Sequence, residues 1–167
     1  MPRSTLVLMR HARAEAAGEL GDHARPLALA GRRQATRTGE QLAQELPTID
    51  VALVSDALRT RETFKLLAAA HPAMPTATAC EELYLASPRG ILACLAGLDA
   101  TARRVLVVGH EPGMSSLTAW LARELPGSAA SLATGMATGE AAVLAVSGEW
   151  SDLARGTARL DAVLRPG

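Results

Sequence analysis

The chain has 167 residues, of which 49% are hydrophobic, 20% charged and 2% aromatic. This length fits a single domain over residues 1–167, with a core built mainly from Ala, Leu and Val. The 17 Lys and Arg residues balance the 17 Asp and Glu residues, so no overall basic charge exists to attract nucleic acid or an anionic membrane, and neither is expected as a partner. No run approaches the ~20 apolar residues of a membrane span, and the first ten residues do not resemble a signal peptide, which predicts a soluble, cytoplasmic protein.

Apolar segments of strand and helix length alternate along the chain. Short apolar runs predict strands, and apolar residues at helical spacing predict helices between them. In chain order, the expected elements are a strand over 4–9, a helix over 27–46, a strand over 51–55, a helix over 57–70, a weak strand over 76–80, a helix over 88–98, a strand over 104–110 and a helix over 112–125.

The C-terminal part of the chain has a different pattern. Segment 126–140 is rich in small residues and is expected to be a loop, and two strands follow over 140–146 and 157–164. The alternation before them predicts βαβ units, because parallel strands need crossover helices. We therefore expect an α/β fold: a three-layer α/β/α domain with a mostly parallel central sheet, to which the last two strands add an edge hairpin.

Polar residues follow directly after four of the expected strands. Ligands of open α/β sheets bind beyond the carboxyl ends of the strands, so these residues are expected to share one rim of the sheet. They are Arg10 and His11 after the first strand, Ser55, Asp56 and Arg59 after the second, Glu81 and Glu82 after the third, and Gly109, His110 and Glu111 after the fourth. The remaining histidines, His23 and His71, fall in expected loops and are expected at the surface.

This set of residue types suits a phosphoryl group. Arginine offers a planar pair of donors to negatively charged oxygens, and a neutral imidazole can attack phosphorus and hold the group covalently. A second, protonated imidazole can donate to the oxygens, and the N-terminus of the helix after His110 adds a positive dipole end. No metal is expected, because no histidine–carboxylate cluster has ligand spacing, and no other cofactor is indicated.

Three motifs carry a resemblance to a known family. "LMRHARAE", "VSDALRTRET" and "VLVVGHEPGMSSL" each follow or span their own strand and resemble, in order, the motifs of the histidine phosphatase (phosphoglycerate mutase-like) superfamily. "RPLALAGRRQA", "EELYLAS" and the tail "GEWSDLARGTARLDAVLRP" are similar to its short SixA-type phosphohistidine phosphatase branch. The resemblance covers almost the whole chain.

The resemblance implies roles for four residues. His11 is the expected nucleophile and becomes phosphohistidine, Arg10 and Arg59 bind phosphoryl oxygens, and His110 completes the phosphate site. Two alternatives come from the residues themselves: Arg59 could pair with Glu62 on its own helix, and His110 could be a core histidine.

The proton donor is left open. The resemblance places the superfamily's carboxyl group near Glu82, with Glu81 and Glu111 as alternatives, and Glu111 could equally serve the start of its helix. An imidazole leaving group has a conjugate acid of pKa ~6.5 and departs with far less help than an alkoxide, so a phosphohistidine substrate could need no dedicated acid.

Arg25 is expected near the mouth of the site, where a substrate-binding role and a solvated surface position are equally favoured. Three positions depart from the family pattern. Ala12 replaces the glycine common after the nucleophile, which is typical of the SixA branch. Ala28 stands where that branch often has threonine and Asp56 replaces a frequent proline, and these two changes concern contacts at the rim.

The sequence therefore predicts a metal-independent phosphatase that acts through phosphorylated His11. Its expected partner is a phosphohistidine-bearing protein, since no long inserted lid separates the second motif from "EELY". A phosphatase of small phosphorylated metabolites is the first alternative, and a non-catalytic phosphate- or phosphohistidine-binding module is the second. The oligomeric state is not indicated.

Overall fold

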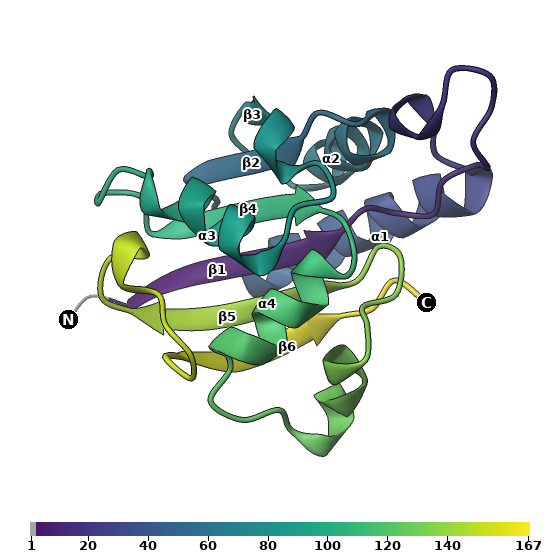
Figure 1. Ribbon diagram of the computed structural model, residues 1–167. Coiled ribbons are helices and arrows are strands. Elements are labelled where there is room, and N and C mark those ends of the chain that lie inside the picture. The colour runs from purple at the N-terminus through teal and green to yellow at the C-terminus, as the bar shows by residue number, and fades with distance from the viewer. Residues whose placement is uncertain (1–2) are drawn as a thin grey trace.

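A computed structural model describes residues 3–167. Strands and helices alternate through most of it (Figure 1). In chain order they are β1 (Arg3–Arg10), α1 (Leu29–Glu45), β2 (Val51–Ser55), α2 (Leu58–Ala70), β3 (Ala77–Cys80), α3 (Pro88–Ala96), β4 (Arg104–Gly109), α4 (Gly113–Leu121), β5 (Ala141–Ser147) and β6 (Ala158–Leu164). Short 3-10 turns lie between them: η1 (Asp22–Ala24), η2 (Glu81–Leu83), η3 (Gly127–Ala133) and η4 (Trp150–Asp152).

Within the described residues, the strands form one six-stranded sheet in the order β3-β2-β4-β1-β5-β6. The first four strands of this order run parallel, whereas β5 pairs antiparallel with β1 and β6 pairs antiparallel with β5. The β5–β6 hairpin therefore forms one edge of the sheet. The predicted α/β fold, with a mostly parallel sheet and an edge hairpin, is confirmed.

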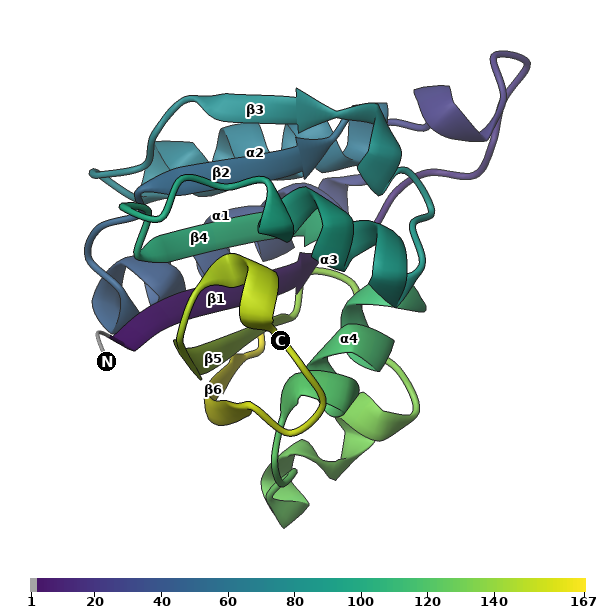
Figure 2. The same cartoon turned by 60° about the vertical axis from the view of Figure 1, so that its left-hand side comes forward.

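Helices cover both faces of the sheet (Figures 1 and 2). Strand β1 shows why: Leu6 and Leu8 pack in a cluster with α3 and α4, whereas Val7 and Met9 pack on the opposite face with α1 and α2. A strand buried on both faces can carry polar side chains only near its ends. The end of β1 is where Arg10 and His11 lie.

The structure departs from the sequence predictions in three places. Helix α4 ends at Leu121 rather than continuing to residue 125, because the backbone N–H of Arg123 donates to the carbonyl oxygen of Ala158 over 2.9 Å and joins this segment to β6. The expected loop over 126–140 contains the turn η3. His71 is buried rather than exposed, since its Nε2 finds the carbonyl oxygen of Leu46 at 2.8 Å.

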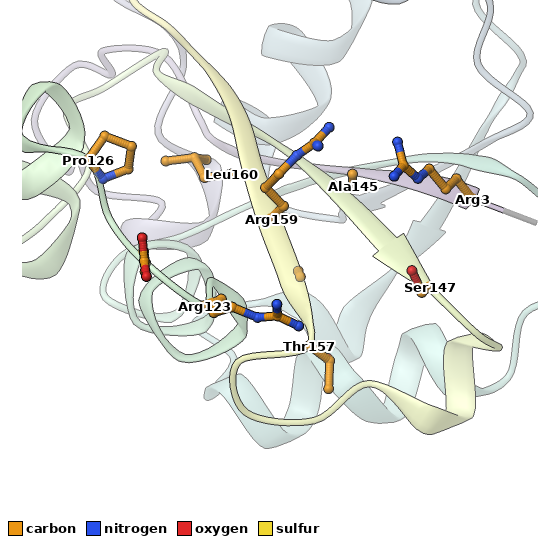
Figure 3. A pocket seen from close by; sticks show the side chains of 10 residues that line it. Arg3, Arg123, Pro126, Ala145, Ser147, Thr157, Arg159 and Leu160 are labelled. Carbon is orange, nitrogen blue, oxygen red and sulfur yellow. The ribbon is translucent and has the colours of Figure 1, made fainter. Parts of the chain in front are cut away.

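An open groove of about 560 Å³ lies where β1 begins, at the opposite end of that strand from His11 (Figure 3). Arg3, Arg123 and Arg159 line it. It is remote from the residues that the motifs single out. No helix within residues 3–167 is long and apolar enough to cross a membrane.

Candidate active site

Strands β1 and β4 bring the two motif histidines together. They pair in parallel with Arg10 opposite Gly109, and the backbone N–H of His11 donates to the carbonyl oxygen of Gly109 over 3.0 Å. His11 and His110 each follow directly, so their ring centroids lie 5.3 Å apart. The predicted meeting of these two residues at one rim follows from the register of two neighbouring strands.

Helix α2 supplies Arg59, whose side chain is almost wholly buried. The hydroxyl of Thr60 donates to the carbonyl oxygen of Ser55 and ties the first turn of α2 to the end of β2. The hydroxyl of Thr63 accepts from the backbone N–H of Ala12 and donates to the carbonyl oxygen of Arg59. These threonines therefore fix α2 against both neighbouring strand ends.

The guanidinium of Arg59 lies between the two imidazoles. Its Nε–H donates to Nε2 of His11 over 3.3 Å, and its Nη2 lies 3.2 Å from Nδ1 of His110. Because arginine only donates, both of these ring nitrogens are acceptors and present lone pairs. The other nitrogens then carry the protons: Nδ1 of His11 donates to the carbonyl oxygen of Ala12 and Nε2 of His110 to the hydroxyl of Ser55, each over 2.8 Å.

Both imidazoles are held neutral. Burial, together with the positive charges of Arg59 and Arg10, lowers the pKa of His11 to about 4. Burial and Arg59 lower the pKa of His110 to about 3. A neutral His11 matches the prediction of a nucleophile, but a protonated His110 was expected and this structure favours the neutral ring. An anionic phosphoryl group beside His110 would favour its protonated form.

Arg10 completes a set that we call the rim site, consisting of Arg10, His11, Arg59 and His110. Its Nη1 donates to the carbonyl oxygen of Met136 over 2.8 Å, while its Nε is buried without a hydrogen-bond partner among the described residues. A buried donor without an acceptor is unfavourable, and an anionic oxygen would satisfy it. His11, Arg59 and His110 thus meet through their lone pairs and donors, and Arg10 adds a donor that has no partner among the described residues.

Asp22 also belongs to this site, although the sequence patterns did not indicate it. It lies in turn η1 of the loop between β1 and α1, and its Oδ2 accepts from Nη2 of Arg59 over 3.0 Å. Its backbone carbonyl accepts from Nη1 of Arg59 over 2.8 Å, and the hydroxyl of Tyr84 donates to Oδ2 over 2.5 Å. These contacts hold the pKa of Asp22 well below its usual range, with Tyr84 the largest cause and Arg25 the next. Asp22 is therefore an ionised carboxylate seated against Arg59.

Arg25 stabilises the same loop. Its Nη1 donates to Oδ1 of Asp22 over 3.0 Å and its Nε donates to the carbonyl oxygen of Glu15 over 2.7 Å. His23 is 3.0 Å from a carboxylate oxygen of Asp56 and packs its ring edge-on against Tyr84. Arg25 is thus bound to the loop, and it is close enough to the rim site that, after burial and the charges of Arg59 and Arg10, its own charge also lowers the pKa of His11.

The structure does not bring Glu82 to the rim site. Glu81 and Glu82 are both exposed in turn η2. Burial raises the pKa of the Cys80 and Cys94 thiols, and the nearby charge of Glu82 adds a smaller contribution in the same direction. No hydrogen bond or ion pair joins Glu82 to the rim site in the described part of the chain. A 3-10 turn directs only some of its residues inward, and here Leu83 is the buried one.

Glu111 has a structural position at the start of α4. Its carboxylate accepts from the backbone N–H groups of Ser115 and Met136, over 2.9 and 3.1 Å, and from the hydroxyl of Ser115 over 2.5 Å. Glu111 therefore serves the start of its helix, which is one of the two roles expected for it. The alternative pairing of Arg59 with Glu62 is not seen, because Glu62 contacts Leu27 and Arg32 instead.

The arrangement can perform phosphoryl transfer. Nε2 of His11 carries a lone pair that now accepts from Arg59, and Arg10, Arg59 and a protonated His110 can together neutralise phosphoryl oxygens. Within residues 3–167, no group of three or more His, Cys, Asp or Glu side chains is placed to hold a metal ion.

Comparison with known proteins agrees with this chemistry. Residues 6–84 match the model of the histidine phosphatase superfamily (branch 1). An uncharacterised protein of Mycobacterium tuberculosis (strain H37Rv) is 36% identical over 157 residues, which cover 91% of this chain and 96% of that protein. A structure from Nakamurella multipartitia that carries the name of a phosphohistidine phosphatase, SixA, is 38% identical, covers 99% of this chain and 98% of its own, and has a TM-score of 0.87.

A more distant structure shows the same fold with a different named substrate. Mycobacterial glucosyl-3-phosphoglycerate phosphatase is 20% identical, with a TM-score of 0.65, and the match covers 96% of this chain and 98% of that chain. At this identity the likeness is one of fold alone.

Proposed function

This chain belongs to the histidine phosphatase superfamily and is a phosphatase, and from that premise we propose that it hydrolyses phosphohistidine side chains on a protein through a covalent intermediate on His11. The observation that carries this choice of substrate is the state of the carboxyl groups that are candidate proton donors. Asp22 is held ionised by its partners, Glu111 is bonded to two backbone N–H groups, and Glu82 is exposed beside two cysteines. An alkoxide leaving group needs a protonated donor, whereas an imidazole does not.

In the first step, Nε2 of His11 attacks phosphorus and the bond from phosphorus to the substrate's imidazole nitrogen breaks. A phosphohistidine ring that is protonated on its other nitrogen leaves as neutral imidazole. An imidazole pKa of ~6.5 lets solvent supply that proton. The electron pair of the broken bond remains on the leaving nitrogen. Arg10, Arg59 and a His110 protonated at Nδ1 donate to the phosphoryl oxygens during the transfer.

In the second step, water attacks the phosphorus bound to His11 and the bond to Nε2 breaks, which releases inorganic phosphate. The hydrogen bond from Nδ1 of His11 to the carbonyl oxygen of Ala12 supports this step. It keeps a proton on Nδ1 while Nε2 carries the phosphoryl group, so His11 also leaves as a neutral imidazole. The same contact that selects Nε2 as nucleophile thus prepares the intermediate for hydrolysis.

The surface of the rim supports a protein as the carrier of the phosphohistidine. Leu20, Leu29 and Leu85 are 86%, 66% and 57% exposed, and they lie at the tip of the β1–α1 loop, at the start of α1 and directly after Tyr84. Exposed apolar side chains on the segments that lead to and from a site favour contact with another protein. A small charged metabolite would gain little from them.

The test is dephosphorylation of a purified phosphohistidine protein by the wild type and by His11→Ala. The wild type should release inorganic phosphate and form an acid-labile phosphoenzyme, and His11→Ala should do neither. Equal rates for the two proteins would refute the mechanism. Faster turnover of a small phosphate ester than of the phosphohistidine protein would replace the proposed substrate by the metabolite alternative.

A further inference from the structure

The guanidinium of Arg59 has almost no donor left for a substrate. An arginine carries five N–H groups. In this structure one is directed to His11, one to His110 and two to Asp22. A phosphoryl group that binds through Arg59 must therefore take donors that the protein itself now occupies.

The carboxylate of Asp22 accepts from these donors of Arg59 in the way that a bound anion would. Its carboxylate oxygen lies 3.0 Å from Nη2 of Arg59, and its charge is stabilised by the hydroxyl of Tyr84 and by Arg25. A carboxylate bound by a guanidinium and neighbouring donors offers the same kind of contact as a phosphoryl oxygen. Arg59 also directs its Nε–H at the lone pair of the nucleophile, Nε2 of His11, which is thereby covered.

The loop that carries Asp22 can move away from the rim site. Turn η1 contains no buried residue, so its movement exposes little apolar surface. Gly21, directly before Asp22, has a φ of 82°, and nothing lies within 4 Å of the position of its missing Cβ. The neighbouring Leu20 is exposed to solvent. Polar contacts of two residues hold η1 over the site: Asp22 with Arg59 and Tyr84, and His23 with Asp56 and Tyr84.

We propose that Asp22 is an internal substitute for the phosphoryl group, and that binding of substrate exchanges it off Arg59. The proposal rests on the proposed function, since it assumes that Arg59 binds the phosphoryl oxygens. On this exchange, Arg59 turns its donors from Asp22 to the phosphoryl oxygens, and the lone pair of His11 becomes free to attack. Asp22 thus keeps the rim site closed to weakly bound anions, and a substrate must compete with it.

The competing explanation is that Asp22 only holds Arg59 in the orientation that phosphate needs. The two explanations predict opposite effects on anion affinity. If Asp22 competes, its removal raises the affinity for inorganic phosphate, because the binding-competent form no longer has to be generated. If Asp22 only positions Arg59, its removal lowers that affinity.

The experiment is calorimetric titration of the folded protein with inorganic phosphate, comparing wild type with Asp22→Asn. Both proteins carry Arg123→Gln, which removes one arginine of the remote groove and limits anion binding there. Asp22→Asn should bind phosphate roughly tenfold more tightly or better. Asp56→Asn is the matched control, since Asp56 pairs with His23 from the same loop but does not contact Arg59, and it should change the affinity less than about twofold. Unchanged or weaker binding by Asp22→Asn would overturn the exchange.

Tyr84 gives a second measurement, because it is the only tyrosine in the chain. Incorporated fluorotyrosine gives one ¹⁹F resonance, and Asp22→Ala defines its position when the carboxylate is absent. Saturating phosphate should move the wild-type resonance toward that position, and a wild-type resonance that stays in place would overturn the exchange. Tyr84→Phe, which weakens the hold on Asp22 without removing its charge, should raise phosphate affinity by less than Asp22→Asn does. Neither readout requires turnover, so failure to hydrolyse phosphohistidine would refute the substrate and leave the exchange standing.

Discussion

The Nε–H of Arg59 donates to Nε2 of His11 over 3.3 Å, so one side chain both fixes the tautomer of the proposed nucleophile and covers its lone pair. The other end of the same guanidinium contacts His110 and Asp22. Arg59 therefore connects the two histidines of the rim site to the loop between β1 and α1.

Arg59→Lys should lower kcat/KM for a phosphohistidine protein by about 100-fold or more. A lysine ammonium is a point charge and cannot contact both imidazoles and the phosphoryl oxygens at once. Steady-state release of inorganic phosphate measures the effect, with Arg61→Lys on the same helix as a control, since Arg61 is exposed. A loss of less than tenfold would show that the planar fork of Arg59 is not used.

The placement of the rim site could be predicted from the sequence because each of its residues lies on a regular element or directly after one. Arg10 ends β1 and His11 follows it, His110 follows β4, and Arg59 lies in the first turn of α2. Buried strands in a parallel sheet bring their carboxyl ends to one rim, so the positions in the sequence were enough. Predicting where these residues lie did not require knowing their chemical roles.

Asp22 could not be found in the same way. It lies in an irregular loop, 37 residues from Arg59 in the sequence, and no periodicity describes the path of such a loop. Glu82 illustrates the converse: the end of β3 was placed correctly, but turn η2 buries Leu83 and leaves the carboxylate outside. Tyr84, two residues later, is the member of that segment that contacts the site.

Glu82→Gln should leave kcat/KM for a phosphohistidine protein within about twofold of wild type, because an exposed carboxylate beside Cys80 and Cys94 does not reach the reacting atoms. Release of phosphate from a phosphohistidine protein and from a small ester, measured in parallel, provides the check. A loss of tenfold or more on the protein substrate would assign Glu82 to catalysis after all.

Glu111→Gln should affect stability more than activity. The carboxylate accepts from two backbone N–H groups and one hydroxyl, so its conversion to an amide should lower the free energy of unfolding by about 1–3 kcal/mol. Urea denaturation measures this change. The turnover per folded molecule should stay within about threefold of wild type, and a large loss of turnover at unchanged stability would instead support a catalytic Glu111.

Acidification should destabilise the protein through its two site histidines. The pKa values of His11 and His110 are about 4 and about 3 in the folded chain, below the usual value of 6.5, so the unfolded chain binds more protons as the pH falls. The free energy of unfolding therefore rises with pH between the pKa values of the folded chain and that of the unfolded chain. The destabilisation is absent above about pH 6.5 and grows as the pH falls towards the pKa values of the folded chain. For His11 alone the loss is on the order of 3 kcal/mol.

Replacing the two histidines separates their contribution from that of other acid-sensitive groups. A His11→Asn, His110→Asn double variant cannot take up these protons, so its free energy of unfolding should depend much less on pH between about 6.5 and 4.5. Denaturation at several pH values, with His71→Asn as a matched variant of a buried histidine outside the site, measures the difference. If the double variant and the wild type lose stability in parallel over this range, the two rings are not held neutral by burial and Arg59.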